Sequence, residues 1–179
     1  MRSASRRGSI NWPAKRAEQV PPDAASHRLT AVTLDEKTLV RRQPEAEHER
    51  AIAIYDLLEE NYFQPVGDFV GPYALTIRLE DNRLVLAIED QTSTAKGEVS
   101  LPVMPFRTII KDYFLICESY YTAIKRASPS QIEAIDVGRR GLHNEGSEML
   151  RERLAGKIEV DRETARRLFT LMCILHIRG

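Results

Sequence analysis

The stretch YALTIRLEDNRLVLAIED, residues 73–90, decides the fold because it predicts a β-hairpin. Apolar residues recur at every second position in both halves, which is the period of a strand with one buried face. The residues expected on that face are Tyr73, Leu75, Ile77, Leu79, Leu84, Leu86 and Ile88. Between the halves, Asp81-Asn82 supplies a tight turn. The stretch GEVSLPV, residues 97–103, is expected to extend this antiparallel meander by a third strand.

Upstream of the hairpin, the sequence predicts one strand and one helix. RLTAVTL, residues 28–34, alternates apolar and polar residues and is rich in β-branched side chains, which favours a strand. Residues 44–63 open with Pro44 and acidic residues, as the N-terminus of a helix often does. The apolar side chains that recur at helical spacing and are expected to face the core are Ile52, Tyr55, Leu58 and Tyr62. Residues 64–72 are punctuated by Pro and Gly and are expected to form a loop.

Downstream of the meander, the sequence predicts three helices. FRTIIKDYFLICESYYTAIKRA, residues 106–127, is apolar over most of its circumference, so we expect a central and heavily buried helix. The residues Ser128-Pro129-Ser130-Gln131 form an N-cap signature, from which a long helix is expected to run towards Ala155-Gly156. Asp161 is expected to cap a last, internal helix that contains ETARRLFTLMCILHI.

This order of elements predicts an α+β fold: a small antiparallel sheet (strand, helix, three-strand meander) packed against three C-terminal helices. We expect residues 28–179 to form a single domain, because this length is enough to bury a core without metal ions or disulfides. Residues 1–27 carry five basic and two acidic residues and almost nothing to bury. They are interpreted as a disordered or mis-annotated basic N-terminal tail.

The composition indicates an ordinary soluble protein. Lys and Arg number 26 and Asp and Glu also number 26, so the whole chain has no net charge to attract nucleic acid or a membrane surface. Cys117 and Cys173 both lie in apolar runs, which suits unpaired thiols in a reducing cytoplasm. No apolar run approaches the roughly 20 residues that a membrane span needs. We therefore expect a cytoplasmic protein that does not bind membranes, and no residue pattern indicates a cofactor.

Four stretches of the chain carry a resemblance to a known family. They are RRQPEAEHERAIAIYDLLEEN, residues 41–61; PFRTIIKDYFLICESYYTAI, residues 105–124; QIEAIDVGRRGLHNEGSEMLRERL, residues 131–154; and TARRLFTLMCILHIRG, residues 164–179. Together they look like the bacterial uncharacterised protein family (UPF) numbered 0262, and the similarity extends from about Leu29 to the C-terminus. The resemblance implies a bacterial, cytoplasmic protein and provides no catalytic residue to transfer.

The helix predicted after Ser128 contains the candidate site. With about 100° of rotation per residue, Arg139 and His143 fall on the same broad face as the apolar residues, whereas Arg140 and Asn144 lie away from it. A guanidinium on that face must reach water or meet an acid, because an unpaired buried charge is costly. The candidate acids are Asp112, Glu118 and Glu145.

Two interpretations of these residues remain open. In the first, Arg139 and an acid form an internal network that fixes the helix, and His143 is a hydrogen-bonded member of it. In the second, Arg139 binds an anion in a cleft and His143 transfers a proton. Three glycines inside this predicted helix, Gly138, Gly141 and Gly146, leave two possibilities for its course. The helix either packs closely against a neighbour or breaks at Gly138-Arg139-Arg140-Gly141, which would leave a basic loop able to hold a phosphate.

Other patterns are weaker. Glu45 and His48 have the spacing of a carboxylate-bridged metal site, but the sequence holds no second copy of this motif, so no metal site is expected. Cys117 is interpreted as an inert core thiol rather than a nucleophile. The order helix, three strands, helix matches that of double-stranded RNA binding domains, but the acidic net charge of the region after the tail does not suit RNA.

The sequence therefore predicts a binding or interaction protein rather than an enzyme. Its expected partner is a protein or a small anionic ligand, and the expected patch on the 128–155 helix consists of Arg139, Arg140, His143, Asn144 and Glu145. The alternative is a small enzyme in which Arg139 binds an anionic substrate while His143 and Glu145 act as acid and base. Nucleic-acid binding through the glycine-flanked Arg139-Arg140 pair is a minor alternative.

Overall fold

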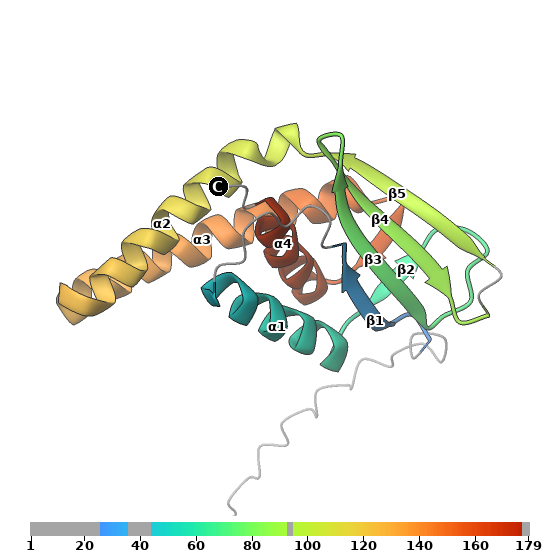
Figure 1. The fold of residues 1–179 in the computed structure, drawn as a ribbon, viewed down its shortest axis with the longest axis horizontal. Coiled ribbons are helices and arrows are strands. Elements are labelled where there is room, and N and C mark those ends of the chain that lie inside the picture. The colour runs from blue at the N-terminus through green and yellow to red at the C-terminus, as the bar shows by residue number, and fades with distance from the viewer. Residues whose placement is uncertain (1–25, 36–43, 93–94, 177–179) are drawn as a thin grey trace, which may run out of the picture.

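The protein is built on a four-stranded sheet beside a group of helices. The computed structural model describes residues 26–35, 44–92 and 95–176. The sheet has the strand order β1 (Leu29–Leu34), β3 (Tyr73–Glu80), β4 (Arg83–Asp90) and β5 (Lys96–Pro102). The α-helices of the described segments are α1 (Pro44–Glu59), α2 (Arg107–Arg126), α3 (Pro129–Leu154) and α4 (Arg162–His176). Figure 1 shows the helices gathered on one side of the sheet, which confirms the predicted α+β fold. Of the predicted basic tail, residues 1–25 lie outside the described residues.

The β3–β4 hairpin has the predicted register. The cross-strand pairs on its inner face are Leu75 with Ile88, Ile77 with Leu86, and Leu79 with Leu84. Every side chain predicted on this face is buried. The turn residues Asp81 and Asn82 have φ angles of 48° and 60°, as a two-residue hairpin turn requires. The alternation in the sequence therefore fixed both the strands and the buried face.

The strand β1 pairs with β3 in parallel, with Leu29 beside Tyr73, so the sheet is mixed and not purely antiparallel as predicted. The physical reason is the connection. The helix α1 lies between the two strands in sequence and carries the chain back to the end of the sheet where β1 starts. A crossover of this kind places the second strand parallel to the first.

A second, two-stranded sheet was not predicted. The strand β2 (Phe63–Pro65) pairs antiparallel with β6 (Ile158–Val160). As a result the predicted helix 44–63 ends at Glu59, and the predicted loop 64–72 starts inside a strand. Strands of three residues are too short to produce a recognisable alternation in sequence.

The helix α2 is not the central, heavily buried helix that its composition predicts. Its buried residues are Ile109, Ile110, Tyr113 and Ala123, whereas Leu115 is 52% exposed. Figure 1 shows the reason: α2 and α3 run side by side as a helical hairpin that projects beyond the sheet. One stripe of α2 packs on α3, and the opposite side of the helix faces solvent.

The central helix is α4, which confirms the prediction that the last helix is internal. It lies between α1 and α3 (Figure 1), and most of its side chains are buried. The carboxylate of Asp161 accepts a hydrogen bond from the Thr164 backbone N–H at 2.8 Å, which confirms the predicted cap. Despite this apolar character, none of the described helices has the length and composition needed to cross a lipid bilayer.

The helix α1 packs inward through a different set of residues from the one predicted. Ala53 and Leu57 are buried, whereas Ile52 is 46% and Tyr55 64% exposed. The predicted Leu58 and Tyr62 are only half-buried. At about 100° per residue, Tyr55 points roughly opposite to Ala53, so one helix cannot bury both sets. The prediction was wrong because it chose the face of the helix that carries Tyr55, Leu58 and Tyr62, which lies roughly opposite to the face of Ala53 and Leu57.

Candidate functional site

The helix α3 that carries the predicted patch is continuous from Pro129 to Leu154. The Ser128 hydroxyl accepts a hydrogen bond from the Gln131 backbone N–H at 3.4 Å, and the Gln131 side chain accepts one from the Ser128 N–H at 3.1 Å. This capping box confirms the predicted start of the helix. Because the helix runs through Gly138 and Gly141 without a break, the alternative of a basic phosphate-binding loop is wrong.

Two of the glycines in α3 permit close contact with neighbouring helices. A Cβ atom on Gly146 would lie 2.2 Å from the Phe169 ring of α4, and one on Gly138 would lie 2.8 Å from the Ile116 side chain of α2. Both distances are shorter than carbon atoms tolerate. Gly141 differs, because a Cβ there would meet nothing within 4 Å.

His143 is buried between α3, α2 and α4. Its ring centroid lies 5.4 Å from the rings of Tyr113 and of Phe169, and its Nε2 atom lies 2.8 Å from the Thr170 hydroxyl. The Thr170 hydroxyl donates its one proton to the Arg166 carbonyl, so it accepts a hydrogen bond from Nε2–H. This arrangement leaves Nδ1 as the unprotonated nitrogen, and among the described residues Nδ1 has no hydrogen-bond partner.

The surroundings keep the His143 ring neutral. Burial away from water lowers its pKa to about 4, and the positive charges of Arg166 and Arg139 act in the same direction. A neutral ring held between two aromatic side chains has no proton to give at neutral pH. It suits a role in packing and hydrogen bonding.

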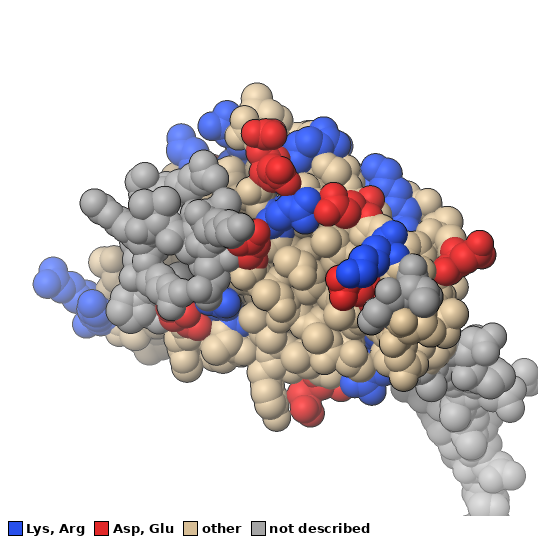
Figure 2. Space-filling model, turned by 45° about the vertical axis from the view of Figure 1, so that its right-hand side comes forward, with Lys and Arg blue, Asp and Glu red and all other residues tan. Residues whose placement is uncertain are grey.

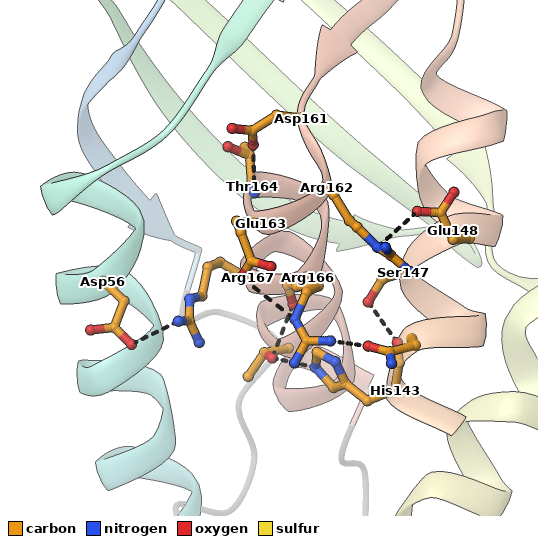
Figure 3. Close-up of polar contacts among 12 residues, drawn as sticks. Asp56, His143, Ser147, Glu148, Asp161, Arg162, Glu163, Thr164, Arg166 and Arg167 are labelled. Carbon is orange, nitrogen blue, oxygen red and sulfur yellow. Dashed lines mark hydrogen bonds and ion pairs between the residues drawn. The ribbon is translucent and has the colours of Figure 1, made fainter. Parts of the chain in front are cut away.

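A set of polar contacts ties α4 to both of its neighbours (Figure 3). Towards α3, Arg166 donates a hydrogen bond to Asn144, and Arg162 forms an ion pair with Glu148 at 3.8 Å. Towards α1, Arg167 forms an ion pair with Asp56 at 3.3 Å. The predicted residue Asn144 is therefore a contact between two helices.

Both arginines of the predicted patch pair with one acid on their own helix. The Arg139 guanidinium donates to Asp136 Oδ1 from Nη2 at 2.7 Å and from Nε at 3.0 Å, and it also stacks 5.1 Å from the Tyr120 ring centroid. Arg140 forms an ion pair with Asp136 Oδ2 at 3.1 Å. The hydrogen bond from Arg139, followed by its positive charge and that of Arg140, lowers the pKa of Asp136. The expected acids Asp112, Glu118 and Glu145 were the wrong choice.

The structure therefore does not bring the five predicted residues together. His143 and Asn144 contact α4, Arg139 and Arg140 share Asp136, and Glu145 is exposed. The contacts of His143 and Arg139 match the first interpretation, an internal network, although the acid lies within α3.

Two other sequence patterns can be placed. Cys117 is half-buried, and burial raises the pKa of its thiol, so it stays protonated and is a poor nucleophile at neutral pH. Within the segments that the structure describes, no three His, Cys, Asp or Glu side chains are grouped to hold a metal ion. The side chain of Glu45, half of the proposed carboxylate–histidine pair, lies outside the described residues.

Sequence reasoning missed the solvent-facing side of the α2–α3 hairpin. We refer to the side that points away from α4 as the outer face. It consists of Lys111, Leu115, Ser119 and Thr122 of α2 and of Ala134, Gly141 and Glu145 of α3, all exposed. An open groove of about 700 Å³ lies on this face near the hairpin tip. Its lining residues are Leu115, Glu118, Ser119, Thr122, Ala123, Arg126, Ala127 and Gln131. The spacing of Leu115, Ser119 and Thr122, i, i+4 and i+7, marks one stripe of a helix and was the available signal.

Charges elsewhere on the surface are mixed. Figure 2 shows basic and acidic side chains interspersed around a broad uncharged area. On β3, Arg78 lies 2.9 Å from Glu80 and 2.8 Å from Glu98 of β5. Among the described side chains of the face in Figure 2, no continuous basic stripe forms, and the minor nucleic-acid alternative gains no support there.

Comparison with known proteins places these observations in a family. The model of the uncharacterised protein family (UPF0262) matches residues 26–178. A UPF0262 protein of Paramagnetospirillum magneticum is 65% identical over 152 residues, which cover 85% of this chain and 97% of the relative. A UPF0262 protein of Rhodospirillum rubrum is 59% identical over 84% of this chain and 93% of its own length, and one of Azorhizobium caulinodans is 61% identical over 90% and 99%. No solved structure matches the chain.

Proposed function

We propose that this chain, which belongs to the uncharacterised protein family (UPF0262), is a binding protein that docks a protein partner on the outer face of the α2–α3 hairpin. The proposal rests on the geometry of the chain itself. The predicted 128–155 helix keeps its place in this proposal, because α3 forms half of that face. The surface itself shifts to the side of α3 that carries Glu145, so that of the five residues of the predicted patch only Glu145 lies on the outer face.

The observation that carries the proposal is the exposed Leu115 beside an open groove. A leucine whose side chain is half in water gains free energy when a partner covers it, at about 25 cal/mol per Å² of apolar area. The groove beside it is lined by the small residues Ser119, Thr122 and Ala123 of α2, which allow another backbone to approach closely, and also by the charged Glu118 and Arg126. Two antiparallel helices with an open groove and an exposed leucine between them form a surface that an amphipathic third helix can fill.

The internal contacts support a protein partner rather than a small anion. A small anion is held best by guanidinium groups whose charge is not already neutralised, but the Asp136 carboxylate pairs with both Arg139 and Arg140 and reduces the net charge of the group from two to one. The enzyme alternative is not favoured either. The protonated Nε2 of His143 is bound to Thr170, and Glu145 lies two residues away, about 200° around the helix.

We also propose that the protein works in the cytoplasm. Both cysteines, Cys117 and Cys173, are free thiols, and Cys173 is buried in the core, where oxidation to a disulfide would require the core to open. Unpaired buried thiols are typical of proteins from reducing compartments.

Site-specific photo-crosslinking tests the docking function. A photoreactive phenylalanine analogue replaces Thr122 on the outer face or, as a control, Thr76 on the solvent side of β3, and each variant is expressed in Rhodospirillum rubrum. We expect covalent protein adducts from position 122 and few from position 76, because only the first lies on the proposed surface. Equal or absent adduct formation at the two positions would show that the outer face docks no protein.

A further inference from the structure

We propose that the protein docked on the outer face is a second copy of this chain, and that the two hairpins pack face to face into a four-helix bundle. The twofold axis lies between the hairpins and runs parallel to the helices, so α2 of each copy covers α3 of the other. This inference rests on the function proposed above and names the occupant of the same surface.

The outer face is organised around one contact inside the hairpin. Tyr113 of α2 and His143 of α3 lie at the same level, with ring centroids 5.4 Å apart, and both point into the protein. Lys111 and Leu115 each stand two residues from Tyr113, about 200° around α2, and therefore point outward. Gly141 and Glu145 stand two residues from His143 and point outward from α3 in the same way.

Because α2 and α3 are antiparallel, these four outward residues form two levels. Leu115 is level with Gly141, and Lys111 is level with Glu145. A twofold axis parallel to the helices keeps each residue at its level and exchanges α2 with α3. It therefore places Leu115 of one copy over Gly141 of the other, and Lys111 over Glu145.

Leu115 and Gly141 are complementary in shape. Gly141 lies inside a helix, where glycine is unfavourable relative to alanine, and no contact with the described residues requires it, since a Cβ there would meet none of them within 4 Å. Gly138 and Gly146 each have such a contact within the chain. The open space at Gly141 accepts a large side chain from outside, and Leu115 is the exposed apolar side chain at that level.

Lys111 and Glu145 are complementary in charge. Both side chains are exposed, and the arrangement sets the lysine of each copy against the glutamate of the other, so that the contact occurs twice per dimer. Towards the hairpin tip, Val137, which is 57% exposed, lies level with Ser119 beside the groove of the other copy. Large residues thus meet small ones along the shared face, as in the packing of helical bundles.

The size of the face predicts a reversible dimer. A helix of 20 residues is about 30 Å long, and two helices side by side are about 20 Å wide. A face of this size buries on the order of 1,000 Å² in total, which is at the lower end for specific complexes. The monomer–dimer equilibrium should therefore depend on protein concentration in the micromolar range.

Analytical ultracentrifugation of the full chain over about 1 to 100 µM tests this inference. We expect the mass to rise from that of one chain towards twice that value. Leu115→Asp and Gly141→Gln should each shift the dissociation constant by more than tenfold, whereas Tyr55→Asp, at an exposed position of α1, should leave it unchanged. Thermal unfolding should show Gly141→Gln to be at least as stable as the natural chain, because its side chain enters open space.

Charge reversal provides the most specific readout. Lys111→Glu and Glu145→Lys should each weaken the dimer, and the double variant should restore it. A chain that stays monomeric at every concentration, or a dimer that none of these changes affects, would refute the inference. If the chain is monomeric while position 122 still crosslinks to a different protein, the proposed function stands and only the identity of the partner is wrong.

Discussion

Replacing Gly146 with alanine is expected to destabilise the protein, although alanine favours helices. The new Cβ would lie 2.2, 2.5 and 2.7 Å from three atoms of the Phe169 ring. Carbon atoms in contact are normally about 3.5 to 4.0 Å apart, so the ring or the helix has to move by about 1 Å. Phe169 is fully buried in the core and has little room to do so.

The size of the effect follows from two opposing contributions. Overfilling a packed core costs about 1 to 3 kcal/mol, and alanine in place of glycine inside a helix returns about 1 kcal/mol. We therefore expect Gly146→Ala to lower the free energy of unfolding by about 1 to 2 kcal/mol. Gly141→Ala is the matched control on the same helix, because its Cβ meets nothing within 4 Å. It should raise the free energy of unfolding by up to about 1 kcal/mol.

Urea unfolding followed by far-ultraviolet circular dichroism measures both variants against the natural chain. The comparison should be made at low protein concentration, so that self-association does not contribute. If Gly146→Ala is as stable as the natural chain, or if the two alanine variants change stability equally, then close packing against Phe169 is not the reason for the glycine.

Three further predictions concern the polar contacts of α3. The pKa of His143 is about 4 in the folded chain and about 6.5 in the unfolded chain, so its contribution to the free energy of unfolding is complete above pH 6.5 and is lost as the pH falls towards 4. Between pH 7 and pH 5, the free energy of unfolding should therefore fall by about 2 kcal/mol more in the natural chain than in His143→Phe. Thr170→Val removes the acceptor of the His143 Nε2–H and should lower the free energy of unfolding in urea by about 1 to 3 kcal/mol. A variant as stable as the natural chain would contradict this role of Thr170. Asp136→Ala removes the carboxylate shared by Arg139 and Arg140. Because these ion pairs are partly exposed, the free energy of unfolding should fall by less than about 1 kcal/mol. A larger fall would mean that the ion pairs are stronger than their exposure suggests.

The parts of the fold that the sequence predicts well are those with long, regular patterns. The alternation over residues 73–90 spans two full strands and leaves one choice of buried face. The three-residue strands β2 and β6 have no such pattern and form because the folded chain brings them together. The parallel pairing of β1 follows from the helical crossover, which is visible in the order of elements but was not used.

Burial within a helix was harder to predict than the helix itself. The helix α2 has apolar residues on several sides. Which side is buried depends on the neighbours of the helix, and beyond the edge of the sheet α2 runs beside α3. In α1, the small residue Ala53 is buried and the large Tyr55 is 64% exposed, which hydrophobicity alone would reverse. Such choices depend on the shape of the neighbouring helix, and sequence spacing does not contain that shape.

The candidate site was predicted in part. Helical rotation correctly placed His143 among the apolar residues, but its partner Thr170 lies 27 positions away on another helix and leaves no trace in the local pattern. The partner of Arg139, in contrast, was within reach. Asp136 stands three residues earlier on the same helix, a spacing at which side chains of opposite charge regularly pair.

The three glycines of α3 illustrate why self-association deserves the first experiment. In sequence they are equivalent weak points of one helix, each unfavourable by about 1 kcal/mol relative to alanine. In the structure a Cβ on Gly146 would meet the buried Phe169 ring and one on Gly138 would meet the end of the Ile116 side chain, whereas one on Gly141 would meet none of the described residues within 4 Å. A substitution at Gly141 therefore has opposite expected effects on two measurable quantities, since it stabilises the isolated chain and weakens the dimer. A change that only disturbed folding would lower both, so the sign of the two effects separates a docking surface from a packing defect.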